Sequence, residues 1–165
     1  MAQFRKITPC LWFDDQAEEA ANLYVSVFPN SRIVQIARYS KAGFEFHGKP
    51  EGSVMTVVFE LGGHEFTALN GGPEFKFDEA ISLQIFCDTQ EEVDYFWDKL
   101  TADGGAPGPC GWLKDKFGLS WQVTPNAFIE MMGDPDPVKR ERVLNAAFRM
   151  GKVDIAALRR AYAGE

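Results

Sequence analysis

The chain has 165 residues, 45% of them hydrophobic, and a formal net charge of -7 at neutral pH. This length suits one domain or two small half-domains, and the 14 Phe and 4 Trp residues supply an aromatic core. The negative charge argues against a nucleic-acid partner or an anionic membrane, since both require a basic surface. No apolar run approaches the ~20 residues of a membrane-spanning helix.

The cysteines and the N-terminal residues indicate the cellular compartment in which the protein is expected. Cys10, Cys87 and Cys110 are odd in number and lack C-x-x-C spacing, which indicates reduced thiols and not a disulfide or zinc framework. Residues 1–6 lead toward a strand without the apolar stretch of a signal peptide. These features predict a cytoplasmic protein.

The first half of the chain predicts a strand, a helix and three further strands. Asp15 is expected to cap the helix, with Glu18 in the capping-box position. Gly62-Gly63 predicts a two-residue hairpin turn, and Asn70-Gly71-Gly72-Pro73 ends the last strand. The predicted strands are 7–13, 32–39, 53–61 and 64–69, with a loop over 40–52.

The second half repeats this order. Phe13-Asp14-Asp15-Gln16-Ala17-Glu18-Glu19-Ala20 is echoed by Phe86-Cys87-Asp88-Thr89-Gln90-Glu91-Glu92-Val93. Asp88 is the expected cap and Glu91 its capping-box partner. Strands are predicted over 82–87, 112–116 and 119–124, and residues 105–109 are the one place for a further short strand. A repeated unit of this kind fixes the fold class.

Short helices are predicted after Pro125. One covers 128–132, one begins at Pro137 with Asp136 as its cap, and one follows the cap Asp154. The sequence therefore predicts an α+β fold with units near 4–78 and 79–126, and helices over 127–165 that pack on the same body.

Several segments resemble the PhnB-like family, whose members are often labelled as a 3-demethylubiquinone-9 3-methyltransferase domain. The resemblance rests on Leu11-Trp12-Phe13-Asp14, on Tyr24-Val25-Ser26-Val27-Phe28-Pro29-Asn30-Ser31, on Asn70-Gly71-Gly72-Pro73, and above all on Cys110-Gly111-Trp112-Leu113-Lys114-Asp115-Lys116-Phe117-Gly118-Leu119-Ser120-Trp121-Gln122-Val123. It covers the chain to about Met150.

The resemblance implies membership of the vicinal-oxygen-chelate superfamily, with glyoxalase I and bleomycin-resistance proteins. The implied fold is two βαβββ units whose curled sheets enclose a cavity, and many members are homodimers. Members that use a metal hold it at four inward strand positions, which correspond here to about Thr8, Thr67, Ile81 and Gln122. Ile81 cannot bind a metal and threonine is a poor ligand for zinc or nickel, so we expect no metal and no cofactor.

His47 and His64 are most simply surface residues. A methyltransferase of the usual kind has a glycine-rich turn after its first strand, whereas here that strand ends in Phe13-Asp14-Asp15. The methyltransferase label is therefore not supported by these residues, and whether the chain is an enzyme stays open.

The expected ligand site is an aromatic wall with a few polar groups. At three places the strand phase leaves alternatives: Trp12 or Leu11, Gln84 or Ile85, and Trp121 or Gln122. Cys110 is more simply a packed thiol than a nucleophile, because no histidine is near it in sequence. The predicted ligand-binding residues are Trp12, Asn70, Phe75, Gln84, Cys110, Trp112, Trp121 and Gln122.

Three functions fit these features. The first is a metal-free protein that binds a small aromatic or apolar molecule in the cavity between the sheets, as a homodimer. The second is a metal-dependent lyase, isomerase or dioxygenase of the superfamily. The third is an interaction module whose cavity is filled by its own side chains.

Overall fold

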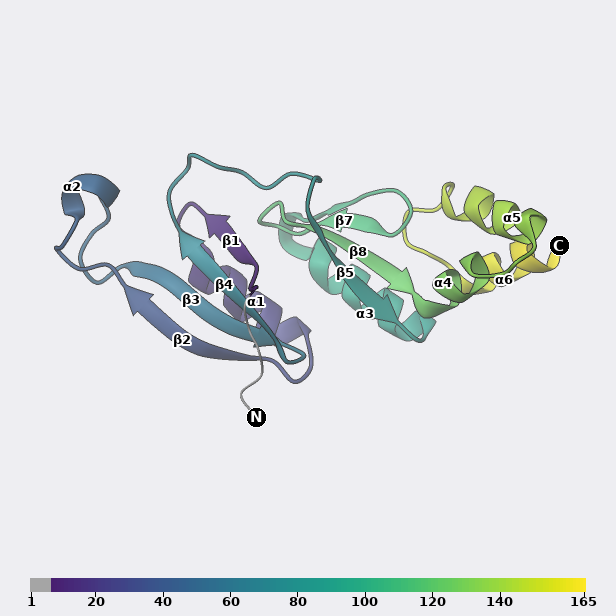
Figure 1. Cartoon of the computed structure of the whole chain (residues 1–165), viewed down its shortest axis with the longest axis horizontal. Coiled ribbons are helices and arrows are strands. Elements are labelled where there is room, and N and C mark those ends of the chain that lie inside the picture. The colour runs from purple at the N-terminus through teal and green to yellow at the C-terminus, as the bar shows by residue number, and fades with distance from the viewer. Residues whose placement is uncertain (1–6) are drawn as a thin grey trace. The chain divides into compact units, whose positions relative to one another are not determined.

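The computed structural model describes residues 7–165, which form two compact units, one ending at Lys76 and one comprising Phe77–Glu165 (Figure 1). Residues 1–6, which we expected to lack the apolar stretch of a signal peptide, lie outside the described residues. The first unit contains β1 (Cys10–Phe13), α1 (Ala17–Val27), β2 (Arg32–Arg38), α2 (Phe44–His47), β3 (Val54–Leu61) and β4 (His64–Asn70). The short helix α2 lies in the segment predicted as loop.

The first unit has one four-stranded sheet in the order β1-β4-β3-β2. β1 is parallel to β4, and β3 is antiparallel to both of its neighbours. The turn from β3 to β4 has positive φ at both glycines, 54° at Gly62 and 86° at Gly63, as a two-residue hairpin requires. The hairpin prediction is confirmed.

The second unit has the same plan and then continues into helices. Its elements are β5 (Ser82–Cys87), α3 (Gln90–Thr101), the 3-10 turn η1 (Ala102–Gly104), β6 (Ala106–Pro107), β7 (Trp112–Lys114), β8 (Ser120–Pro125), α4 (Asn126–Met132), α5 (Pro137–Ala147) and α6 (Ile155–Ala163). The sheet order is β5-β8-β7-β6, and β5 is parallel to β8. The short strand expected within 105–109 is β6, and the two βαβββ units are confirmed.

Each sheet buries one face against its own helix. In the first unit Leu11, Phe13 and Phe59 are buried, and Phe59 meets Tyr24 of α1 with ring centroids 6.0 Å apart. In the second unit the buried residues are Ile85, Cys87, Leu113, Trp121 and Val123 on the sheet and Val93, Trp97 and Leu100 on α3. We call the opposite face of each sheet its open face.

The helices α4, α5 and α6 belong to the second unit. Val143, Ala147, Val153 and Leu158 form their buried core, and Cys110 packs against it. The Cys110 N–H donates to the Met150 carbonyl at 2.7 Å and the Gly111 N–H to the Gly151 carbonyl at 2.8 Å. These backbone hydrogen bonds attach the helices to the loop before β7.

Both predicted capping boxes are wrong in detail. No side chain of its own segment caps α1; the Ala17 N–H donates instead to Asn70 Oδ1 at 2.8 Å, across 53 residues. The cap of α3 is Thr89, whose hydroxyl accepts from the Glu92 N–H, one residue later than predicted. The predicted caps Asp136 and Asp154 are confirmed.

Candidate functional site

The open face of the second sheet carries a row of hydrogen-bonded polar side chains. Gln84 and Gln122 lie opposite one another in the parallel β5–β8 pair. Gln84 Nε2 donates to Gln122 Oε1 at 3.3 Å, and Gln122 Nε2 donates to Ser82 Oγ at 2.7 Å. The three side chains therefore form one short chain of hydrogen bonds along the face.

Two aromatic residues share this open face with the amides. Side chains alternate along a strand, so Phe86 lies on the same face as Gln84 and is 54% exposed, whereas Ile85 between them is 7% exposed. Trp112 of β7 lies directly opposite Gln122 and is half-buried. Residues paired across strands share a face, so Trp112 and Phe86 place aromatic surface beside the amides.

The segment that precedes β5 covers one end of this face. The Ser120 hydroxyl donates to the Asp78 carbonyl at 3.4 Å, and Lys114 Nζ lies 2.6 Å from Glu79 Oε1. The hydrogen bond from Lys114 is the largest cause of the lowered pKa of Glu79. The one basic side chain on strands β5, β7 and β8 is thus already paired with a carboxylate.

In the first unit the indole of Trp12 is held on the open face of its sheet. Its Nε1 donates to the Gly72 carbonyl at 2.8 Å, and its ring meets Phe75 edge-on with centroids 4.9 Å apart. A Cβ on Gly71 would lie 2.2 Å from Trp12 Cζ2, so this position excludes any side chain. The Asn70-Gly71-Gly72-Pro73 segment therefore positions Trp12.

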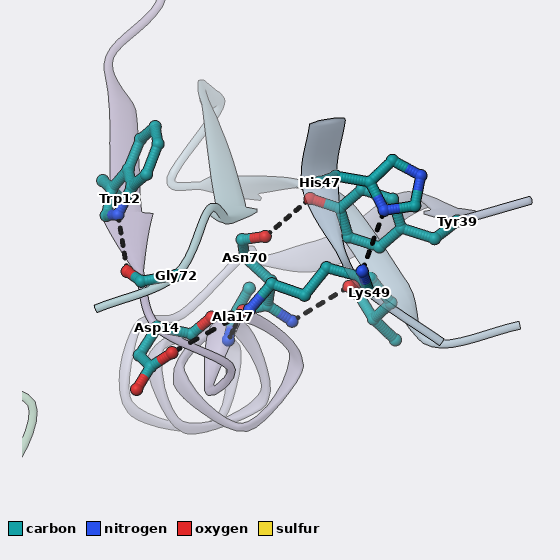
Figure 2. Close-up of polar contacts among 9 residues, drawn as sticks. Trp12, Asp14, Ala17, Tyr39, His47, Lys49, Asn70 and Gly72 are labelled. Carbon is teal, nitrogen blue, oxygen red and sulfur yellow. Dashed lines mark hydrogen bonds and ion pairs between the residues drawn. The ribbon is translucent and has the colours of Figure 1, made fainter. Parts of the chain in front are cut away.

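Asn70 is 5% exposed and its side chain is bonded inside the protein, as Figure 2 shows. Its Oδ1 accepts from the Ala17 N–H, and its Nδ2 donates to the Val54 carbonyl at 3.1 Å. The Tyr39 hydroxyl donates to the Asn70 backbone carbonyl at 2.7 Å. Asn70 thus joins α1, β3 and the end of β2, on the helix side of its sheet.

The ring of His47 in α2 is also fixed by protein groups. His47 Nδ1 accepts from the Lys49 N–H at 2.9 Å (Figure 2), and Nε2 lies 3.2 Å from the Ala42 carbonyl oxygen. The ring packs on Tyr39 with centroids 4.5 Å apart. Both nitrogens have structural partners, whereas His64 is exposed at the start of β4.

Besides Asn70, two of the predicted site residues lie away from the open faces. Trp121 is 2% exposed on the α3 side, where its Nε1 donates to Asp115 Oδ2 at 2.9 Å. Cys110 packs against the C-terminal helices, and burial raises the pKa of its thiol. The structure thus resolves the three strand-phase alternatives as Trp12, Gln84 and Gln122 on the open faces.

The four positions predicted to correspond to the metal ligands of the superfamily, about Thr8, Thr67, Ile81 and Gln122, do not fit a divalent cation. The Gln122 amide is engaged by Ser82 and Gln84, and Ile81, 73% exposed, has no donor atom. The other two positions, Thr8 and Thr67, offer only neutral hydroxyls. Within residues 7–165 no group of three or more His, Cys, Asp or Glu side chains is placed to hold a metal ion.

Sequence reasoning missed Ser82 and Phe86. Both lie two residues from Gln84, so strict alternation along the strand over 82–87 was the signal that identifies them. It also missed a groove of about 670 Å³ between the starts of α3 and α6. In that groove Gln90 Oε1 accepts from the Ile155 N–H at 2.9 Å, and its Nε2 donates to the Val153 carbonyl at 3.0 Å.

The repeated βαβββ units with mixed sheets define a protein of the glyoxalase/bleomycin-resistance fold, as the sequence predicts. The model of the 3-demethylubiquinone-9 3-methyltransferase family matches residues 5–124. The chain belongs to this PhnB-like family. The helices α4, α5 and α6 lie beyond the matched segment.

Several solved structures are similar to this chain. A putative 3-demethylubiquinone-9 3-methyltransferase, PhnB protein, from Bacillus cereus is 39% identical, with a TM-score of 0.63 over 73% of this chain and 99% of that chain. Protein PA1353 from Pseudomonas aeruginosa is 19% identical, with a TM-score of 0.56 over 72% and 96% of the two chains. A fosfomycin resistance protein from Listeria monocytogenes is 14% identical, with a TM-score of 0.49 over 73% and 91%.

A search of curated proteins found no match. None of the helices that the structure describes is long and apolar enough to cross a membrane.

Proposed function

We propose that this protein binds a small, largely aromatic molecule on the open face of its second sheet, without a metal ion. The observation that carries the proposal is the hydrogen-bonded row Ser82, Gln122 and Gln84 between the aromatic residues Phe86 and Trp112. Ligand sites are commonly built from aromatic walls with a few placed polar groups. Trp12 and Phe75 give the first unit an aromatic surface of the same kind.

The side chains at the four predicted metal-ligand positions argue against the metal-dependent alternative. A lyase, isomerase or dioxygenase of the superfamily would need ligands for a Lewis-acidic cation, and the four corresponding positions supply a hydrophobic side chain, two hydroxyls and an engaged amide. The family name suggests methyl transfer. The turn from β1 to α1 has no glycine, and the first N–H of α1 is already bonded to Asn70, which argues against binding of an anionic cofactor group there.

Binding can be tested with a library of aromatic fragments and NMR of the side-chain amide groups. We expect hits to shift the signals of Gln84 and Gln122, and Trp112→Ala to weaken these hits at least tenfold. Phe148→Ala, which truncates an exposed aromatic residue after α5, is the control and should leave binding unchanged. Fragments that bind solely in the groove beside Gln90 would contradict the proposal.

The proposal that the protein binds its ligand without a metal ion has a separate test. Protein purified without added metal should contain less than stoichiometric zinc, nickel, manganese and iron by elemental analysis. A stoichiometric metal that is lost in Gln122→Ala would overturn it in favour of the metal-dependent alternative.

We also propose that the protein is a cytoplasmic homodimer. The aromatic residues on the open faces are a liability on an isolated monomer, and the three cysteines are free, which suits a reducing compartment. Light scattering at high micromolar concentration should give the mass of two chains. A mass of 18.5 kDa would contradict the homodimer.

A further inference from the structure

We infer that the ligand of the second sheet is an uncharged planar ring with a lactam edge, meaning a ring N–H beside a ring carbonyl. This inference rests on the proposed function, because it specifies the ligand of the same open face. It follows from which hydrogen-bonding atoms of the amide row remain available, from the charge of the face and from its aromatic residues.

The direction of the hydrogen bonds leaves Gln84 as the end of the row. Gln84 Nε2 uses one hydrogen on Gln122 Oε1, and Gln122 Nε2 donates in turn to Ser82 Oγ. A primary amide has two N–H donors and a carbonyl acceptor. In the part of the chain that the structure describes, Gln84 Oε1 and the second N–H of Gln84 have no partner.

A free carbonyl and the N–H cis to it on one planar amide are complementary to a lactam edge, which requires that the bond to Gln122 uses the other hydrogen, trans to Gln84 Oε1. The ring N–H would donate to Gln84 Oε1, and the ring carbonyl would accept from Gln84 Nε2. The bond to Gln122 holds the Gln84 amide in one orientation, so less rotamer entropy is lost on binding.

The charge of the face selects against ionised ligands. A carboxylate has acceptors only and would leave Gln84 Oε1 without a donor. The one ammonium group on strands β5, β7 and β8, that of Lys114, is paired with Glu79 at 2.6 Å. An anion would therefore meet no unpaired lysine on these three strands, whereas a neutral lactam satisfies the available atoms.

The aromatic residues indicate a flat ring. Phe86 follows Gln84 by two residues on β5, and Trp112 lies opposite Gln122 on β7, so aromatic surface flanks the amide row. Offset or edge-on contacts with such rings stabilise a planar ligand beyond the burial of its area.

The test compares quinolin-2(1H)-one with its N-methyl derivative, which keeps the rings and the carbonyl and lacks the N–H. Titration calorimetry should give at least tenfold tighter binding for the parent compound. Gln84→Leu should remove that difference. Gln16→Leu, the same change at an exposed residue before α1 whose side chain makes no cap, should preserve it.

The outcomes separate the inference from the proposed function. If both compounds bind equally and Trp112→Ala weakens both, the open face is a ligand site and the lactam inference is wrong. If neither compound binds and no fragment shifts the amides of Gln84 and Gln122, the inference and the proposed function both fail. A tenfold preference that survives Gln84→Leu also overturns the inference.

Discussion

At the scale of single residues, Asn70 joins segments of the first unit that are far apart in sequence. It replaces the local cap of α1 and also bonds β3. Sequence reasoning placed it in the ligand site because it begins a glycine-rich segment. A cap from a residue 53 positions away leaves no local signal, so the pattern around Asp15 and Glu18 was misleading.

We predict that Asn70→Ala destabilises the protein by about 3 kcal/mol, because the Ala17 N–H and the Val54 carbonyl lose a buried partner. The free energy of unfolding in urea is the measurement. Asn145→Ala, at an exposed position of α5, should change it by about 0.5 kcal/mol or less. Equal effects of the two substitutions would contradict the structural role of Asn70.

The three thiols should differ in reactivity. Cys87 is fully buried, and desolvation, followed by the charges of Glu92 and Asp88, raises its pKa to about 12. Cys10 is exposed, although partial burial raises its pKa too. We predict that iodoacetamide modifies Cys10 first and Cys87 only after unfolding, as mass spectrometry of peptides can show. Modification of Cys87 in the folded protein at the rate of Cys10 would disagree with this burial.

At the scale of elements, the C-terminal helices are tied to α3 by an ion pair and by Gln90. Lys152 Nζ lies 2.9 Å from Asp94 Oδ1, and Gln90 Nε2 lies 3.2 Å from the same oxygen. The hydrogen bond from Lys152, then that from Gln90, lowers the pKa of Asp94 below its ordinary value of 3.8.

The sign of the pH dependence follows from this shift. The pKa of Asp94 is lower in the folded protein, so its contribution is fully present above pH 3.8 and is lost as the pH falls through the folded-state pKa. We predict that the stability difference between wild type and Asp94→Asn is constant from pH 7 to 5 and shrinks below pH 4. Thermal unfolding measures it, and a difference of the same size at pH 2.5 would refute the prediction.

The turn between β7 and β8 is a second element whose order depends on one carboxylate. Asp115 is 3% exposed; its Oδ1 accepts from the N–H groups of Phe117 at 2.9 Å and Leu119 at 3.1 Å, and its Oδ2 accepts from Trp121. We predict that Asp115→Ala costs about 3 kcal/mol or more of unfolding free energy, because these buried donors are left unpaired. Glu91→Ala, at an exposed position of α3, is the control and should change the unfolding free energy by about 0.5 kcal/mol or less. If Asp115→Ala lowers the unfolding free energy by less than about 1 kcal/mol, the turn does not depend on the Asp115 carboxylate.

At the scale of the whole molecule, the fold could be predicted, whereas the faces on which the candidate site residues lie could be predicted only in part. The duplicated strand–helix pattern indicated two similar units, and the family resemblance implied the βαβββ plan of each. The parallel pairing of β1 with β4 and of β5 with β8 has no local signal in the sequence. The sequence did not determine which face of the sheet each β8 side chain lies on, because both Trp121 and Gln122 are residue types found in ligand sites. The buried bond from Trp121 to Asp115 decides it, and that contact depends on how the 116–119 turn folds.

The alternation of β5 and β8 has a consequence for how such a protein can evolve. On both strands the even-numbered side chains lie on the open face and the odd-numbered ones are buried or face α3, as Gln84 and Gln122 contrast with Ile85 and Trp121. If the open face binds a ligand as proposed, substitutions at every second position of these strands can change the ligand preference without altering the packed face. A saturation library of both strands, sorted for soluble expression, should tolerate polar replacements at 84, 86, 122 and 124 and reject them at 85, 87, 121 and 123.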